Sequence, residues 1–202
     1  MNKLFNIIFK DLKKDKAVYY SLVIVCIISI IFGIFFITIL KDSDKTLLSN
    51  HINSFLDSIE KGEYKPSIIN ILSTNNITGL IISILGFSII GIPILIIILF
   101  YKGFTLSFTI TSLIYNFKID GILLSFIYIF PHLVINFIIY FILIYYAFKL
   151  SLILIGTLLN KKKITKKCLQ KYIIILLISI ILLSISALYE TFILPHLIKM
   201  LY

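Results

Sequence analysis

The 202-residue chain is strongly apolar: 60% of its residues are hydrophobic, only 14% carry a charge, and its mean hydropathy is +1.10. A soluble domain contains about 25% charged residues, so lipid must solvate most of this chain, and no polar stretch is large enough for a separate enzyme domain. The net charge of +10 does not indicate nucleic-acid binding, because the lysines cluster at the ends of apolar runs, where they meet anionic lipid and fix orientation. The two cysteines, Cys26 and Cys168, are too few for a disulfide framework.

The first segment, residues 1–17, combines apolar side chains at helical spacing with interspersed lysines. This pattern predicts a basic amphipathic helix on the cytoplasmic surface of the membrane, with a simple solvated start as the alternative. The apolar run that follows is too long for the h-region of a secretory signal and lacks a small-residue cleavage site. It is therefore expected to be the first membrane-spanning helix and not a cleaved signal. Residues 18–202 are therefore expected to form a single membrane bundle.

Five apolar stretches are expected to cross the membrane as helices, which makes the protein an all-α, polytopic helical bundle. A crossing of roughly 30 Å needs about 20 residues at 1.5 Å per residue. The lysines before the first stretch and within 161–171 place the N-terminus in the cytoplasm and the C-terminus outside, by the positive-inside rule. The predicted crossings are 18–40, 77–101, 103–117, 121 to about 148, and 172–194.

The second and third predicted crossings meet at Lys102, which is expected at the cytoplasmic membrane surface. Pro93 is expected to kink the second crossing. The third, 103–117, is short and rich in threonine and serine, so it can span only with little tilt or in a thinned bilayer. A re-entrant pair built from 103–145 is the alternative.

Two polar segments lie between the predicted crossings. Segment 160–171 holds the densest lysine cluster and is expected in the cytoplasm, whereas segment 41–76 is expected on the opposite side. Within 41–76, apolar residues recur on one helical face, and they must be covered by lipid headgroups, by the bundle itself or by a partner. Packing on the bundle is the default, and a partner face is the functional interpretation. We call this set the apolar stripe: Leu48, Ile52, Phe55 and Ile59.

The sequence shows no catalytic, cofactor-binding or metal-binding pattern. The HExxH, GxSxG and GxxxxGK[ST] motifs are absent, and the three histidines, His51, His132 and His196, are far apart along the chain. Glu190 is the sole acidic residue deep in an apolar run, and such a residue usually faces the bundle interior or a watery cavity. It is therefore the candidate polar site. The alternative is an interfacial carboxylate that reaches outward or pairs with Lys149 or His132.

Three blocks of the chain carry a family resemblance: GLIISILGFSIIGIPILIIILFYKGFTLSFT at 79–109, GILLSFIYIFPH at 121–132 and ALYETFILPHLIKML at 187–201. Their order resembles the stage II sporulation protein M family, the membrane component of the forespore engulfment machinery. In that family a Gly/Pro-bearing helix leads into a turn like the one expected here. The matching positions are Lys102, Gly103 and Phe104 for the turn, Pro131 and His132 for the fourth segment, and Glu190, Phe192 and Pro195 for the end of the last helix.

The chain departs from the family pattern at a few positions. Ser107 stands where a glycine is common, and Leu133 and Val134 follow His132 without the glycine and glutamate of broader relatives. Those relatives include proteins of non-sporulating bacteria, some of them linked to bacteriocin export. The departures favour the sporulation branch.

The resemblance implies a non-enzymatic scaffold that anchors and localises the peptidoglycan-degrading stage II sporulation proteins D and P at the septum, in the mother-cell membrane, during forespore engulfment. These two proteins and membrane lipid are the expected partners. Self-association is left open, and neither a cofactor nor nucleic acid is expected. The alternative is a permease-like or export subunit that works with an ATPase partner. Such a subunit needs a continuous polar cavity through the bundle, whereas this sequence offers few ionisable groups for one.

Overall fold

The computed structural model describes residues 11, 15–64, 66–128, 130–159 and 165–199. The described residues form helices joined by short turns, with no strand among them. Five helical segments are long and apolar enough to cross a membrane, so the predicted all-α, five-crossing architecture is confirmed. These segments are Lys16–Ile39, Ile68–Leu85, Gly91–Phe126, His132–Leu158 and Lys166–Leu197.

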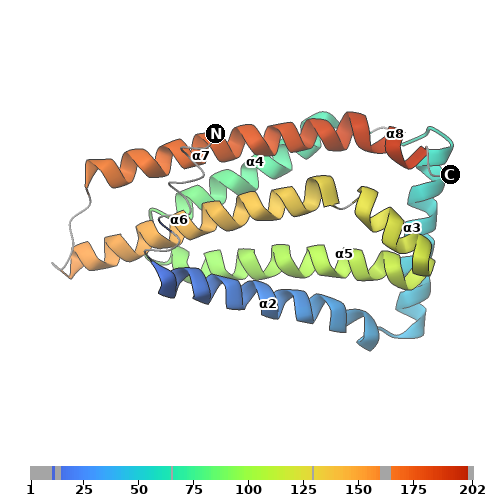
Figure 1. The fold of residues 1–202 in the computed structure, drawn as a ribbon, viewed down its shortest axis with the longest axis horizontal. Helices are drawn as coiled ribbons and strands as arrows, with labels where there is room; N and C mark the ends of the chain where they lie inside the picture. The colour runs from blue at the N-terminus through green and yellow to red at the C-terminus, as the bar shows by residue number, and fades with distance from the viewer. Residues whose placement is uncertain (1–10, 12–14, 65, 129, 160–164, 200–202) are drawn as a thin grey trace.

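The five membrane-spanning segments run side by side, and a more polar helix, α3, lies across one end of the bundle (Figure 1). The helices are α2 (Lys16–Ile39), α3 (Asp42–Glu60), α4 (Ile68–Leu85), α5 (Gly91–Tyr128), α6 (Ile135–Leu158), α7 (Lys166–Leu188) and α8 (Leu194–Lys199). We call the end that holds α3 and α8 the α3 end. We call the other end, with the start of α2, the end of α6 and the start of α7, the lysine-rich end. The placement of the lysine-rich end in the cytoplasm stays a prediction.

The second and third crossings differ from their predicted boundaries. The predicted crossing 77–101 is broken at 86–90, where α4 ends and the chain turns back into α5. Gly91 permits this turn, because a Cβ there would lie 1.9 Å from the carbonyl oxygen of Leu85. Ser151 holds the turn because its hydroxyl shares its one hydrogen between the carbonyl oxygens of Gly86 (3.1 Å) and Ser88 (2.9 Å). Hydropathy missed the turn because most of its residues are apolar.

Helix α4 begins nine residues earlier than predicted, at Ile68 rather than at 77, so the polar segment is shorter than 41–76. The polar run that suggested a loop lies inside the bundle. Asn76 donates a hydrogen bond from Nδ2 to Ser184 Oγ (3.1 Å), and the backbone carbonyl of Asn75 accepts one from the Tyr140 hydroxyl (3.1 Å). These contacts tie the polar run to α6 and α7 within a membrane-spanning helix, although the Nδ2 of Asn75 stays without a partner among the described residues.

Helix α5 joins residues that were predicted to belong to three crossings: the end of the second, all of the third and the start of the fourth. Pro93 lies in its first turn, where proline fits a helix without kinking it. Lys102 lies within the helix rather than at a turn, so the predicted Lys-Gly-Phe turn is wrong. Residues 103–117 continue a helix of full crossing length, which favours a crossing over the re-entrant alternative. The chain doubles back at Lys118 (φ 53°), and a Cβ on Gly121 would lie 2.2 Å from the carbonyl oxygen of Leu113.

The fourth crossing spans His132–Leu158, so it begins after the predicted Gly121 and ends beyond the predicted 148. It passes through a π-helical turn, Phe130–Val134, before α6 starts. Helix α6 is the most buried of the long helices, and its fully covered residues Leu143, Ile144 and Ala147 form the centre of the core. The last crossing contains a second π-helical turn, Tyr189–Ile193.

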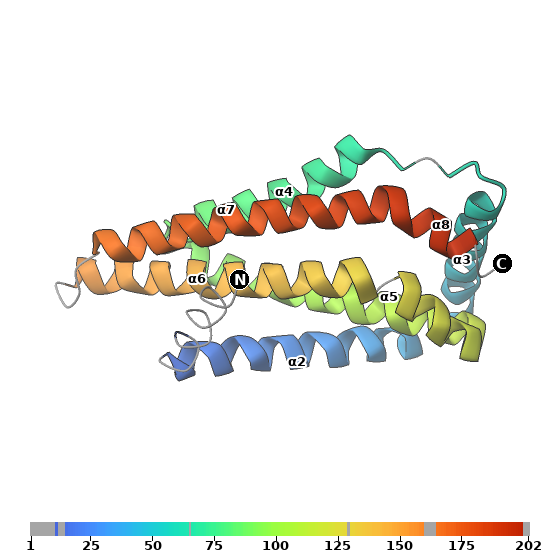
Figure 2. The ribbon, with the colours of Figure 1, turned by 45° about the horizontal axis from the view of Figure 1, so that its top comes forward.

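Helices α2 and α5 pack closely through small residues, and Figure 2 shows them running together along one edge of the bundle. A Cβ on Gly33 would lie 1.9 Å from Ser107 Oγ and 2.7 Å from the carbonyl oxygen of Phe104. A Cβ on Gly103 would lie 2.1 Å from Ser29 Oγ. Each helix therefore contributes a serine and a glycine four residues apart, the small-xxx-small pattern of close membrane helix pairs. Gly103 is a packing residue, not part of a turn.

Candidate functional site

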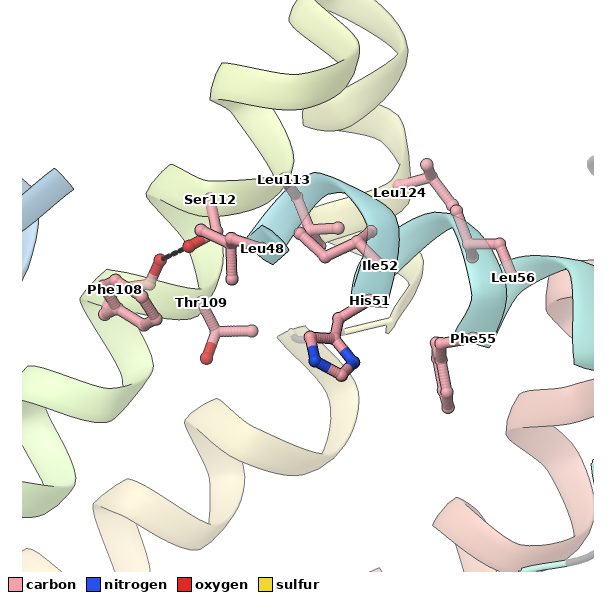
Figure 3. A pocket seen from close by; sticks show the side chains of 10 residues that line it. All are labelled: Leu48, His51, Ile52, Phe55, Leu56, Phe108, Thr109, Ser112, Leu113 and Leu124. Atoms are coloured by element: carbon pink, nitrogen blue, oxygen red, sulfur yellow. Dashed lines mark hydrogen bonds between the residues drawn. The ribbon is translucent and has the colours of Figure 1, made fainter. Parts of the chain in front are cut away.

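The α3 end contains an open apolar cavity of about 240 Å³ between α3 and α5. Three residues of the apolar stripe, Leu48, Ile52 and Phe55, point into it from α3 (Figure 3). The hydroxyls that border it are already used within α5, since Ser112 donates to the carbonyl of Phe108 (2.7 Å). The cavity therefore offers apolar contact and little hydrogen bonding. Its lining residues are Leu48, His51, Ile52, Phe55, Leu56, Phe108, Thr109, Ser112, Leu113 and Leu124.

The C-terminal part of the apolar stripe packs on the chain's own last helix. Ile59 is 2% exposed and lies in a small core with Leu194. Phe55, Tyr64 and Tyr189 surround that core. Ile52 and Leu48, by contrast, are only half-buried. The stripe is thus divided between a part that fastens α3 to the bundle and a part that lines an open cavity.

Glu190 lies in the π-helical turn between α7 and α8, at the α3 end, and it is half-buried. Burial raises the pKa of Tyr64, and the nearby charge of Glu190 raises it further. Glu190 does not pair with Lys149, which forms an ion pair with Asp15 at the lysine-rich end instead. The carboxylate therefore acts on the connection after α3 and not on the lysine-rich end of the bundle.

His132 and Pro131 lie in the first π-helical turn, Phe130–Val134, and the His132 side chain is 2% exposed. His51 lines the cavity at α3 and is exposed, and His196 is also exposed. Among the described residues, no three His, Cys, Asp or Glu side chains gather as metal ligands. The structure does not bring the three histidines together.

Lys102 lies inside the bundle, about 16 Å along α5 from Gly91 at 1.5 Å per residue. Its ammonium stands 4.7 Å from the centre of the Tyr140 ring, a cation–π contact. Lys102 and Tyr140 line a cavity of about 160 Å³ together with two asparagines, Asn75 and Asn136. Hydropathy did not indicate this site, because a lysine between two apolar runs normally marks a membrane surface.

The lysine-rich end holds a polar cluster that sequence reasoning missed. Asp11 forms an ion pair with Lys171 and accepts a hydrogen bond from the Tyr146 hydroxyl (2.8 Å). Burial alone would raise the pKa of Asp11, but hydrogen bonds from Lys171 and Tyr146, with the charges of Lys171 and Lys149, hold it below its ordinary value of 3.8. Together with the Asp15–Lys149 pair, this cluster fastens Asp11 and Asp15 to α6 and α7.

These features define a multi-pass helical membrane protein with an amphipathic helix across one end and polar side chains buried at mid-bundle. The family model described as Stage II sporulation protein M matches residues 22–195, and the chain belongs to this family. Comparison with curated proteins and with solved structures found no match in either set. The resemblance identified from the three sequence blocks is thereby confirmed, and the protein is a sporulation-related membrane protein.

Proposed function

We propose that the protein is a non-enzymatic scaffold of the mother-cell membrane that anchors and localises the peptidoglycan-degrading stage II sporulation proteins D and P at the septum during forespore engulfment. The observation that carries this proposal is the half-open apolar cavity between α3 and α5. It lies at the end of the bundle that the lysine distribution assigns to the extracytoplasmic side, which is where enzymes that act on peptidoglycan are found.

The division of the apolar stripe supports an anchoring role. Ile59 holds α3 in place through the core that it shares with Leu194. The cavity beside Ile52 is then presented on a supported helix, so a partner can insert an apolar side chain without α3 having to move. Burying a large apolar side chain contributes roughly 1.5–3 kcal/mol, so one anchor of this kind can dominate a small interface.

The arrangement of cavities favours a scaffold over a transport subunit. The cavity at α3, the mid-bundle cavity at Lys102 and a third of about 230 Å³ at the lysine-rich end share no lining residue. Fully buried residues of α6, including Leu143 and Ala147, occupy the centre of the bundle. A transport subunit would need a polar path that joins the two ends.

The proposal is tested by co-purification of the tagged chain from sporulating cells. Ile52→Asp places a charge in the cavity and is expected to reduce recovery of stage II sporulation proteins D and P at least tenfold. Leu47→Asp is the matched control, since Leu47 is 58% exposed on the same helix. Thr109→Phe fills the cavity from α5 without charging α3, and it should also reduce recovery.

Membrane abundance must be measured for each variant, because a fall in abundance would also lower recovery. Recovery of both proteins at the unmodified level by Ile52→Asp and by Thr109→Phe, with normal abundance, would contradict the proposal. Equal loss with Leu47→Asp would show that the cavity is not the contact.

A further inference from the structure

We propose that the mid-bundle cavity at Lys102 binds a carboxylate carried on the transmembrane helix of a partner protein. This inference rests on the proposed anchoring function and adds to it a second contact, within the membrane. The juxtaposition that suggests it is a half-buried lysine, two incompletely hydrogen-bonded asparagines and an opening toward lipid.

The charge of Lys102 has no acidic counterpart in the described part of the chain. The ion pairs there are Lys45–Asp42, Lys149–Asp15 and Lys171–Asp11, and no described carboxylate lies within ion-pair distance of Lys102. An unpaired ammonium at this depth is costly, and charged side chains within spans normally pair or face water. The contact with the Tyr140 ring compensates for only part of this cost. The site therefore favours an anion.

The two asparagines add unused hydrogen-bonding capacity to the same cavity. Asn136 is 5% exposed, and within the described residues no hydrogen bond reaches its Oδ1. Asn75 likewise has a buried Nδ2 without a partner there. An ionised carboxylate has two acceptor oxygens, so it would accept from the Lys102 ammonium and from Asn75 Nδ2.

The opening of the cavity favours a membrane partner over a soluble one. Tyr101, which lines the cavity beside Lys102, is 61% exposed near the middle of a membrane-spanning helix, so the opening faces hydrocarbon. A lipid phosphate would have to leave its headgroup layer and enter by roughly half the 30 Å thickness of the core. An aspartate or glutamate in a transmembrane helix is carried to that depth by its own chain. The depth of the site in the membrane therefore favours a carboxylate on a partner's transmembrane helix over a lipid phosphate.

The inference is tested with the full chain in phosphatidylcholine vesicles. The probe is a synthetic leucine/alanine transmembrane peptide with one central Asp, compared with the same peptide carrying Asn. Association is followed by energy transfer from a donor dye on Cys168. We expect the Asp peptide to associate about tenfold more tightly than the Asn peptide. Lys102→Met should remove this preference, Lys102→Arg should retain it, and Lys41→Met, at the end of α2, should leave it unchanged.

A carboxylate placed in the cavity by mutation, which would compete with the peptide for Lys102, provides a second, independent variant. Asn136→Asp places a carboxylate in the same cavity, so it should remove the preference while keeping Lys102 and leaving thermal stability equal or higher. Equal association of the two peptides with the unmodified chain would overturn the inference. So would a preference that survives Lys102→Met.

Changing the lipid composition of the vesicles distinguishes a bound lipid headgroup from a bound peptide carboxylate. If Lys102-dependent retention of phosphatidylglycerol replaces peptide association when that lipid is added, the site binds lipid and the inference is wrong. Co-purification of stage II sporulation proteins D and P tests the proposed function independently of the Lys102 site. Loss of the peptide preference with normal co-purification would remove the inference and leave the anchoring role intact.

Discussion

At the scale of single residues, Glu190 is a structural residue in this account. It lies half-buried in the π-helical turn that joins α7 to α8, close enough to influence Tyr64. Glu190→Gln keeps the shape and most of the hydrogen-bonding capacity, so we expect normal membrane abundance and normal partner recovery. Glu190→Leu removes that capacity and should lower the free energy of unfolding by about 1–3 kcal/mol. Thermal unfolding in detergent measures the difference.

The Gln variant also separates anchoring from transport. A scaffold needs the turn but not the charge, whereas coupling to protons or ions needs the charge itself. Loss of function in Glu190→Gln, at normal abundance and with partners still bound, would therefore favour the transport alternative.

Also at the residue scale, Gly33 is expected to be less replaceable than Gly103, the other glycine at the contact of α2 with α5. An alanine there would meet the backbone carbonyl of Phe104 at 2.7 Å, and a backbone cannot move aside as a side chain can. We predict that Gly33→Ala lowers the free energy of unfolding by about 1–3 kcal/mol. Gly79→Ala is the control, because its Cβ would meet only the end of the Leu183 side chain, at 3.2 Å. Equal effects of the two substitutions would contradict the observed packing.

At the scale of the elements, hydropathy was sufficient for the number of crossings but not for their boundaries. Ile89 and Ile90 hide the turn between α4 and α5, because a turn packed inside a membrane bundle needs no polar residues where Ser151 already satisfies its carbonyls. The run containing Asn75 and Asn76 led to the opposite error, since residues that look like a loop form part of a crossing. Both errors arise because contacts with other helices decide whether backbone and side-chain polar groups are hydrogen-bonded. A hydropathy profile contains no information about these contacts.

The packing of α2 on α5 was open to prediction, whereas the polar contacts were not. The pairs Ser29–Gly33 and Gly103–Ser107 have the four-residue spacing of close helix pairs, so the signal was present in the sequence. The ion pair of Asp11 with Lys171 joins residues 160 positions apart, and nothing local to either residue indicates it. The apolar stripe was recognised from its period, but only the fold divides it into a packed part at Ile59 and an open part.

At the scale of the whole molecule, the helix arrangement provides a test of the predicted topology at Ser88. Hydropathy placed this residue within the second crossing, whereas the structure places it in a turn at one end of the bundle. Ser88 lies in the α4–α5 turn at the lysine-rich end, with Cys168 near the start of α7. We predict that Asp44→Cys reacts with a membrane-impermeant thiol reagent in intact cells. Ser88→Cys and the native Cys168 should react only after permeabilisation. Labelling of Ser88→Cys or Cys168 in intact cells would reverse the assignment of the two ends.

The central claim is that the α3 end of this bundle holds stage II sporulation proteins D and P, and site-specific photo-crosslinking in sporulating cells tests it most directly. A photoreactive phenylalanine analogue at Ile52, which lines the cavity, is compared with the same analogue at Leu47, which is exposed on α3. The account predicts crosslinks to one or both of these proteins from position 52 during engulfment, and at least tenfold fewer from position 47. Crosslinks from position 52 to lipid or to the chain itself alone, with the D and P proteins present at normal levels, would contradict it.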